Sequence, residues 1–350
     1  RGGCKTTLRS CTDTYAGGYT LVNAEGIRKA LAQVQDPERH KDIVSLGMVR
    51  DIVVEADTAL DSGAKVEVQL TEMTEEERRK ALQGQTQQGA AEHLNKVDHV
   101  LAIMSGKGGV GKSLVTGLLA AELRRRGLRV GILDADITGP SIPKMFGLSG
   151  VPPMGPVGIL PAETDTGIRV MSINLLLPDE GEAVIWRGPL IGGAIQQFWG
   201  DVLWGDLDVL IVDLPPGTSD ASLTVMQSIP LNGVVLVTSP QGLAGMVVRK
   251  AAQMARQLRV PILGVVENMS YAVCPKCGER IEVFGPSQAQ ATALMVGAPL
   301  LGRLPLNPEL AQRADAGAIE AYPLTEFDAI AAEILERMPE QATTPMFAGR

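Results

Sequence analysis

Cysteine, histidine and aromatic residues are all scarce in this chain. Its 350 residues include four cysteines and three histidines, and aromatic side chains make up 3%. So few cysteines exclude a disulfide-stapled scaffold, and we expect the thiols to be reduced, as in the cytoplasm. The histidines are scattered, so neither a histidine metal site nor a hydrolase triad stands out. Aliphatic residues must therefore fill the core.

The sequence also lacks an excess of positive charge and a long apolar run. The net charge is −8, which disfavours binding to nucleic acid. No apolar run reaches the roughly 18 residues that a membrane-spanning helix needs, and no signal-peptide pattern is visible. We therefore expect a cytoplasmic protein that binds neither nucleic acid nor membrane.

The length suggests one large domain and a smaller one. In the smaller domain we predict a helix over 24–35 and strands over 43–54 and 65–70, followed by a charged helix over 75–82. The expected segments are, in order, a disordered leader (1–22), the small α+β domain (23–82), a polar linker (83–97), the main domain (98–338) and a tail (339–350).

Short apolar runs alternate with helical stretches in the main domain. Most of these runs lack polar alternation, so both faces of each predicted strand are buried. This pattern predicts a doubly wound α/β domain with a mostly parallel sheet and a ligand at the carboxyl ends of its strands. The predicted strands are 99–104, 129–133, 170–176, 209–212, 233–238, 262–266 and 300–304, and the predicted helices are 112–126, 190–203, 221–227, 243–258 and 286–296.

A phosphate-binding loop lies between the first of these strands and the helix that follows. The segment Gly-Lys-Gly-Gly-Val-Gly-Lys-Ser satisfies G-x-x-x-x-G-K-[ST]. Its glycines let backbone N–H groups wrap phosphates, its Lys112 reaches the β and γ phosphates of ATP, and its Ser113 hydroxyl can bind Mg²⁺. The candidate ATP-binding residues are Gly106, Lys107, Gly108, Gly109, Val110, Gly111, Lys112 and Ser113.

The candidate catalytic residues are Lys107, Lys112 and Asp136, and the candidate magnesium ligands are Ser113 and Asp213. Lys107 could neutralise charge on the transferred phosphoryl group, although a solvated surface lysine is an equally good interpretation. Asp136 and Asp213 follow buried strands, so Asp213 is expected to bind Mg²⁺, through water, and Asp136 to orient the attacking water. Either aspartate could instead be a helix cap or a turn residue.

Cys274 and Cys277 form a C-x-x-C pair that could ligate one metal centre. One chain supplies only two such ligands, whereas an iron–sulfur cubane or a tetrahedral zinc needs four, so a two-fold dimer would complete the set. The spacing alone leaves an iron–sulfur cluster, a structural zinc, a redox pair and two incidental thiols open. Cys4 and Cys11 have no pairing spacing.

Taken together, these motifs resemble a known family. Lys107 at its place in the phosphate loop is similar to the deviant Walker A lysine of the MinD/ParA/nitrogenase-iron-protein class. Other segments narrow the resemblance to the Mrp/ApbC family of iron–sulfur cluster carrier ATPases. These segments are Asp-Ala-Asp-Ile-Thr-Gly-Pro-Ser (134–141), Trp-Arg-Gly-Pro (186–189), Asp-Leu-Pro-Pro-Gly-Thr-Ser-Asp (213–220), Glu-Asn-Met-Ser (267–270) and Cys-Pro-Lys-Cys (274–277).

The resemblance implies an ATP hydrolase, which we expect to be slow. It would bind a 4Fe–4S cluster between the subunits of a homodimer and pass it to apo iron–sulfur proteins, alongside cluster assembly factors. The implied roles are a partner-reaching lysine for Lys107, a switch I catalytic aspartate for Asp136, a switch II aspartate for Asp213, adenine contact for Asn268 and cluster ligation for Cys274 and Cys277.

The small domain resembles, in part, the PaaD-like iron–sulfur assembly domain, through its segments 36–38 and 46–48. That domain usually continues with a Thr-Pro-Ala-Cys-Pro stretch, whereas this chain has Glu-Met-Thr-Glu (72–75) and no cysteine there. We assign the small domain no chemistry. Two other functions stay open for the whole chain, a MinD/ParA-like partitioning or regulatory ATPase and a zinc-bridged dimeric ATPase.

Overall fold

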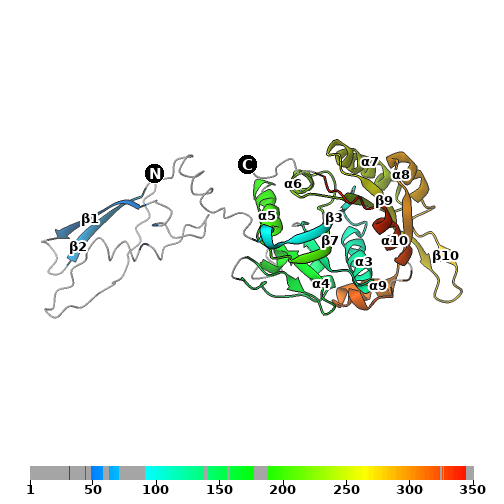
Figure 1. Ribbon diagram of the computed structural model, residues 1–350, viewed down its shortest axis with the longest axis horizontal. Coiled ribbons are helices and arrows are strands. Elements are labelled where there is room, and N and C mark those ends of the chain that lie inside the picture. Colours follow the sequence, from blue (N-terminus) through cyan, green and yellow to red (C-terminus); the bar gives the residue numbers. More distant parts are fainter. Residues whose placement is uncertain are drawn as a thin grey trace. The chain divides into compact units, whose positions relative to one another are not determined.

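The computed structural model divides into two compact units, Arg1–Gln87 and Gln88–Arg350 (Figure 1). Each unit has its own secondary structure. The residues that the structure describes are 31, 44, 49–57, 63–70, 91–136, 141–155, 158–176, 188–323, 325 and 327–343.

The first unit contains an antiparallel pair of strands, β1 (Val49–Asp57) and β2 (Gly63–Leu70). The strand predicted over 65–70 is confirmed, and the one predicted over 43–54 begins at Val49 and extends further. Leu31 lies in a helix, as the pattern over 24–35 predicts. The predicted leader, the charged helix over 75–82 and most of the predicted linker lie outside the described residues.

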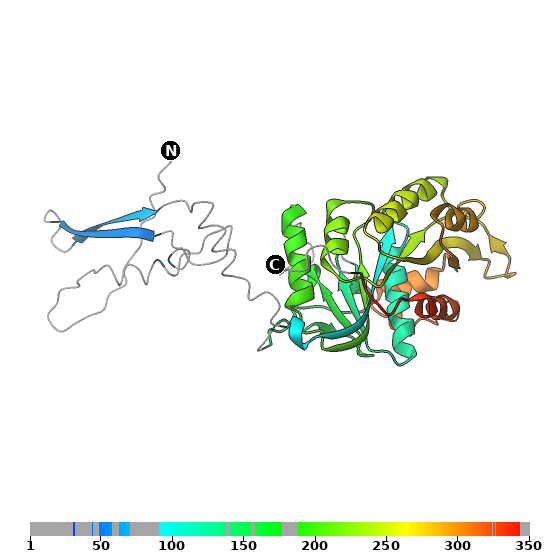
Figure 2. The same cartoon turned by 45° about the horizontal axis from the view of Figure 1, so that its top comes forward.

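The second unit is built on a nine-stranded sheet with the order β10-β9-β8-β3-β7-β4-β6-β5, in which β11 also pairs with β9 (Figure 2). Only the short pairs β5–β6 and β9–β10 are antiparallel, so the predicted mostly parallel sheet is confirmed. The strands are β3 (Lys96–Ser105), β4 (Val130–Asp134), β5 (Ala162–Glu163), β6 (Arg169–Ser172), β7 (Asp206–Asp213), β8 (Gly233–Thr238), β9 (Ile262–Val273), β10 (Arg280–Ile281) and β11 (Leu300–Pro305).

Helices cover both faces of this sheet and create two hydrophobic cores. Along β3, Leu101 and Ile103 belong to one core, whereas Val100, Ala102 and Met104 belong to the other. This alternation of two buried faces explains why the strands show no polar alternation in the sequence. The first core also contains α3 (Lys112–Arg125), α4 (Ile142–Met145), α9 (Pro308–Asp315) and α10 (Asp328–Arg337), and the second contains α5 (Gly188–Gly200), α6 (Asp220–Ser228), α7 (Gly242–Gln257) and α8 (Ala289–Val296).

Several predicted elements of the second unit have different bounds in the structure. The helix predicted over 190–203 ends at Gly200, and the strand predicted over 209–212 begins at Asp206. The strand predicted over 170–176 ends at Ser172, because the Ser172 hydroxyl accepts the Asn174 amide and the chain turns into the 3-10 helix η2 (Ile173–Leu176). The helix predicted over 286–296 begins only at Ala289, because Gln288 is its N-cap and has a non-helical φ of −103°; the Gln288 amide donates to the Glu267 carboxylate.

A further difference concerns β9, for which the sequence predicts an end at residue 266. It continues to Val273 because β11 pairs with it as far as Tyr271 and β10 pairs with Val273. The run Glu-Asn-Met-Ser hides this continuation from a periodicity analysis, since three of its four residues are polar and interrupt the apolar pattern. The extension carries the strand from the sheet to Cys274.

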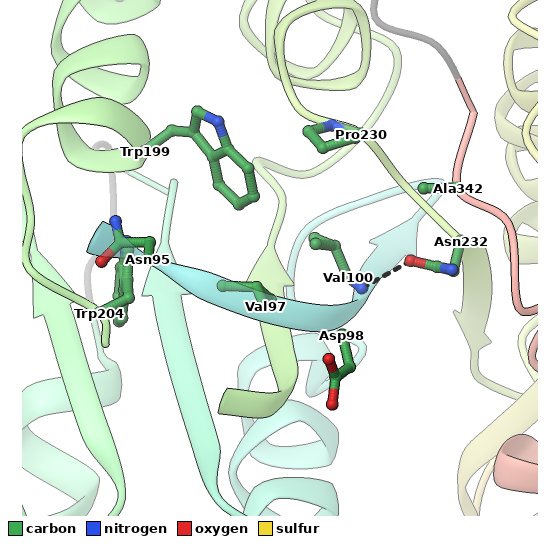
Figure 3. A pocket seen from close by; sticks show the side chains of 9 residues that line it. All are labelled: Asn95, Val97, Asp98, Val100, Trp199, Trp204, Pro230, Asn232 and Ala342. Atoms are coloured by element: carbon green, nitrogen blue, oxygen red, sulfur yellow. Dashed lines mark hydrogen bonds between the residues drawn. The ribbon is translucent and has the colours of Figure 1, made fainter. Parts of the chain in front are cut away.

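The described part of the predicted tail lies against the amino ends of the strands. The Asn232 side chain donates to the Pro339 carbonyl at 2.8 Å, and the Thr343 amide donates to the Leu231 carbonyl at 2.8 Å. A cavity of about 270 Å³ opens beside this segment (Figure 3). It is lined by Asn95, Val97, Asp98, Val100, Trp199, Trp204, Pro230, Asn232 and Ala342.

This cavity lies at the start of β3, whereas the phosphate loop follows the other end of that strand. It is therefore separate from the candidate site. None of the helices in the described ranges is long and apolar enough to cross a membrane.

Candidate nucleotide site and cysteine hairpin

The phosphate loop joins the carboxyl end of β3 to the start of α3. Strand β3 lies between β7 and β8 in the sheet, and Gly111 immediately precedes the helix. Free N–H groups and the positive end of the helix dipole gather at such a terminus, where they favour a phosphate. The predicted strand–loop–helix context of the motif is thus confirmed.

At two positions of the loop only glycine fits, because neighbouring atoms leave no room for a Cβ. Gly111 has φ +78°, and a Cβ added there would lie 2.2 Å from the Asn268 amide nitrogen. A Cβ on Gly106 would lie 2.5 Å from the backbone of Val247 and Val248 in α7. By contrast, Gly109 has φ +77° but open space around it. The loop is therefore clamped between α7 and Asn268 of β9, which follows the last residue of β9 that pairs with β8.

Lys112, Ser113 and Asp213 form one buried polar cluster under the loop. The Lys112 Nζ lies 2.7 Å from Asp213 Oδ2, and the two side chains are 5% and 0% exposed. The Ser113 hydroxyl donates to the same oxygen at 2.5 Å, and the Thr116 hydroxyl donates to Asp213 Oδ1 at 2.7 Å. The Ser113 hydroxyl and the Asp213 carboxylate are hard oxygen ligands side by side, which fits the chemistry of Mg²⁺.

The structure also brings Asp136 to this cluster. Its Oδ2 lies 3.5 Å from Lys112 Nζ, and its side chain is 11% exposed. Asp134 lies fully buried nearby, where it accepts the Ser172 hydroxyl at 3.0 Å and the Asp136 amide at 3.1 Å. Burial, reinforced by the negative charge of Asp213, raises the pKa of Asp134 to about 8.

The segment after Asp213 lies against the phosphate loop. The Leu214 amide donates to the Ile103 carbonyl at 3.1 Å, and the Gly217 amide donates to the Ser105 carbonyl at 2.9 Å. A segment bonded in this way to the strand that leads into the loop can respond to what the loop binds.

Lys107 and Asn268 lie at the edges of the site. Lys107 is partly exposed, and its ammonium group donates to the Gln241 side chain at the start of α7. Asn268 is buried, donates to the Val110 carbonyl at 2.9 Å and accepts the Met269 amide. In this structure Asn268 supports the loop, and its contact with adenine stays a prediction.

Cys274 and Cys277 lie in the turn between β9 and β10, at the edge of the sheet (Figure 1). The turn is tied by bonds from the Cys274 amide to the Glu279 carbonyl and from the Gly278 amide to the Cys274 carbonyl, each 2.9 Å. Cys277 is exposed and Cys274 partly so. The amides of Lys276 and Cys277 lower the pKa of the Cys274 thiol, which favours the thiolate that ligates metals.

The polar cluster of Lys112, Ser113 and Asp213 and the turn that contains Cys274 and Cys277 (the cysteine turn) are separate sites. Strand β9 connects them. Within the described ranges, no group of three or more His, Cys, Asp or Glu side chains could hold a metal ion. Among these residues, the cysteine turn offers two thiols and no third ligand.

Sequence reasoning did not assign Thr116, Asp134, Gln241 or Glu267 to any site. Thr116 is one helical turn after Lys112, so its position beside Asp213 follows from the i, i+4 spacing. Asp134 is visible in the Asp-Ala-Asp motif. Glu267 begins the Glu-Asn-Met-Ser motif, but its partners Ser287 and Arg303 are distant in the sequence, as is Lys107 from Gln241.

Comparison with known proteins assigns the chain. The family model of ParA, described as a NUBPL iron-transfer P-loop NTPase, matches residues 96–339. The chain belongs to this family. The match covers the whole nucleotide site and the cysteine turn of this iron-transfer P-loop NTPase. A second model, of an iron–sulfur cluster assembly protein, matches residues 24–100.

Individual relatives agree with this assignment. An iron–sulfur cluster carrier protein of Methanocaldococcus jannaschii is 47% identical over 253 residues, which are 71% of this chain and 87% of the relative. Another of Deinococcus radiodurans is 42% identical over 335 residues, 89% of this chain and 92% of the relative. A nucleotide-binding protein of Archaeoglobus fulgidus, solved with ADP, has a TM-score of 0.59 at 43% identity and covers 71% of this chain and 95% of that one.

Proposed function

We propose that this iron-transfer P-loop NTPase hydrolyses ATP and carries a 4Fe–4S cluster, held between two subunits, to apo iron–sulfur proteins in the cytoplasm. The single observation that supports this most strongly is the placement of Cys274 and Cys277. They form an accessible half-site at the end of the strand that also contacts the phosphate loop. The carrier names of the relatives point the same way.

The nucleotide step follows from the buried cluster. The phosphates of ATP would compete with Asp213 for Lys112, and Ser113 and Asp213 would hold Mg²⁺, directly or through water, where the ion would neutralise phosphate charge. Asp136, near the same ammonium, orients the attacking water, and Lys107 crosses to the nucleotide of the partner subunit. Loss of the γ-phosphate then releases the segment after Asp213, which rearranges the interface.

The cluster step follows from ligand number. A cubane cluster is held by four thiolates, and one turn offers two, so two-fold symmetry brings the second pair from the other subunit. The cluster is cargo, and an exposed turn suits its release to a recipient. A zinc ion could use the same four thiolates, and metal analysis of protein purified without oxygen distinguishes the two.

The test is cluster transfer under anaerobic conditions. Wild-type protein is reconstituted with iron and sulfide, re-isolated and mixed with an apo 4Fe–4S protein whose activity reports the transfer. We expect the recipient to become active, and the Cys274→Ala variant to carry and transfer little. Replacement of Cys4 and Cys11 by serine is the matched control and leaves transfer intact. If Cys274→Ala retains as much cluster iron as wild type, the proposal is wrong.

A further inference from the structure

Strand β9 connects the phosphate loop to the cysteine turn. Its pairing with β8 ends at Glu267, opposite Thr238, and its pairing with β11 ends at Tyr271, opposite Pro305. Past Tyr271 the described strand pairs only with the two residues of β10. The cysteine turn therefore projects beyond the sheet, and its orientation depends on a few contacts at the end of β9.

The near end of this extension touches the phosphate loop directly. Asn268 bonds to the Val110 carbonyl and fills the space beside Gly111. Cys274 is six positions after Asn268, a span of about 20 Å in an extended chain. A shift of the loop at Gly111 must therefore either move Asn268 or be opposed by the contacts that fix β9 in place.

A buried carboxylate holds the strand at this point. Glu267 is 0% exposed and accepts the hydroxyls of Ser270 and Ser287 and, at 2.9 Å, the amide of Gln288. The guanidinium of Arg303 lies 3.6 Å from the same carboxylate and donates to the Ser270 hydroxyl at 2.7 Å. The charge is thus paired and bonded on several sides, which fixes its position.

Two arginines lie over the ring of Tyr271, between Glu267 and the cysteines. The Cζ of Arg303 is 5.7 Å from the ring centroid, and the Cζ of Arg280 is 4.5 Å from it. Arg280 pairs with Val273, the residue next to Cys274. An unbroken series of contacts thus runs from the buried Glu267, through Arg303 and Tyr271, to the strand of the turn that follows the cysteines.

We propose that Arg280, Tyr271 and Arg303 form a positioning stack that transmits the nucleotide state of the phosphate loop to the cysteine turn. This rests on the proposed function, in which Cys274 and Cys277 hold the cargo. Arg280 is exposed and Arg303 is partly exposed. A cation–π contact at an exposed site is weak, so these contacts can form and break when the strand shifts.

The experiment measures the alkylation rate of Cys274 and Cys277 by iodoacetamide in the full-length, cluster-free protein, with and without MgATP. We expect ATP to change the wild-type rate by at least about threefold. In Arg280→Gln the two rates become equal, while ATP affinity stays within about twofold, because Arg280 is exposed and remote from the phosphate loop. Arg280→Lys, which keeps a cation for the ring, retains most of the ATP effect.

The matched control is Lys276→Gln, which removes a positive charge from the same turn. It alters the alkylation rate with and without ATP by the same factor, so the ATP effect persists. An unchanged ATP effect in Arg280→Gln overturns the stack, and so does the absence of any ATP effect in wild type. Neither result touches the carrier function, which is judged by the iron content of reconstituted protein. If Cys274→Ala loses cluster iron but ATP does not change the alkylation rate of the wild type, the carrier function is supported and the positioning stack is wrong.

Discussion

Lys112 Nζ lies 2.7 Å from Asp213 Oδ2, and this ion pair is nearly inaccessible to solvent. The two residues are 101 positions apart in the sequence, on the helix and the strand that flank the phosphate site. Because each charge neutralises the other, the loop keeps a buried lysine ready for phosphate without leaving it uncompensated.

Removal of the lysine should therefore cost stability as well as nucleotide binding. In Lys112→Met, Asp213 keeps its two hydroxyl donors but loses its counter-charge, and we expect a loss of about 3 kcal/mol in the free energy of unfolding. Urea unfolding followed by tryptophan fluorescence measures this, since all three tryptophans lie in the second unit. Lys107→Met, in the same loop but partly exposed, should change stability by less than about 0.5 kcal/mol. Equal losses in both variants would contradict the buried pair.

Alanine substitutions at Gly111 and Gly109 test whether the contact with Asn268 holds the phosphate loop in place. Both have positive φ, but only at Gly111 would a Cβ meet a neighbour, the Asn268 amide at 2.2 Å. Gly109→Ala should weaken ATP binding by roughly fivefold through backbone strain of about 1 kcal/mol. Gly111→Ala should weaken it at least tenfold more, and Asn268→Ala in the same chain should recover part of the loss. Isothermal titration with ATP checks the order, and similar affinities for the two alanine variants would be inconsistent with the clamp.

An ion pair at the opposite end of the sheet should give the fold a small pH dependence. Arg129 bonds Asp208 through its side chain and its backbone amide, which lowers the pKa of Asp208 below its usual value. A lowered pKa in the folded state means stabilisation that is present above the ordinary pKa near 3.8 and is lost as the pH falls through the lower folded value.

Asp208→Asn should accordingly lower the Tm by about 2 °C between roughly pH 5 and 8, and the difference should shrink below about pH 4. Differential scanning fluorimetry across this range measures it. Asp206→Asn is the control, because Asp206 lies 3.6 Å from the same arginine and is 64% exposed, so its Tm should stay close to wild type at every pH. A constant Tm difference for Asp208→Asn down to pH 3 would exclude the titration.

A MinD- or ParA-like partitioning ATPase would be expected to bind DNA or a membrane surface, whereas a cluster carrier would not. With a net charge of −8, the chain should not sediment with DNA or with anionic liposomes, with or without ATP. ATP-dependent sedimentation with either one would favour a MinD- or ParA-like function over cargo delivery.

Much of the second unit could be predicted because its signals are local. A buried parallel strand appears in the sequence as an apolar run, and the phosphate loop has a fixed spacing of glycines and lysine. These two signals are enough to predict β3, α3, Lys112 and Asp213 from the sequence alone. The extension of β9 is not, since its pairing partners β10 and β11 lie further along the chain and its residues are partly polar. The buried Glu267 is hidden for the same reason: burial of a carboxylate depends on partners as distant as Arg303.

The sequence predicts that Cys274 and Cys277 supply two metal ligands. It does not predict how these cysteines are connected to the nucleotide site. Cys-x-x-Cys spacing indicates two ligands and says nothing about Asn268, which meets Val110 only because β9 passes the loop. The cluster is an expectation from the resemblance to a carrier family, whereas the contacts that connect the phosphate loop to the cysteine turn are visible only in the structure.

The most direct test of the carrier account is the amount of iron and acid-labile sulfide in each oligomeric species after anaerobic reconstitution. Size-exclusion chromatography separates the species, and each fraction is assayed for iron, sulfide and protein. The account predicts about four iron and four sulfide ions per dimer, none in monomer, and loss of both from Cys274→Ala and Cys277→Ala alike. A complete cluster on a monomer, or a dimer that binds zinc in place of iron and sulfide, would contradict it.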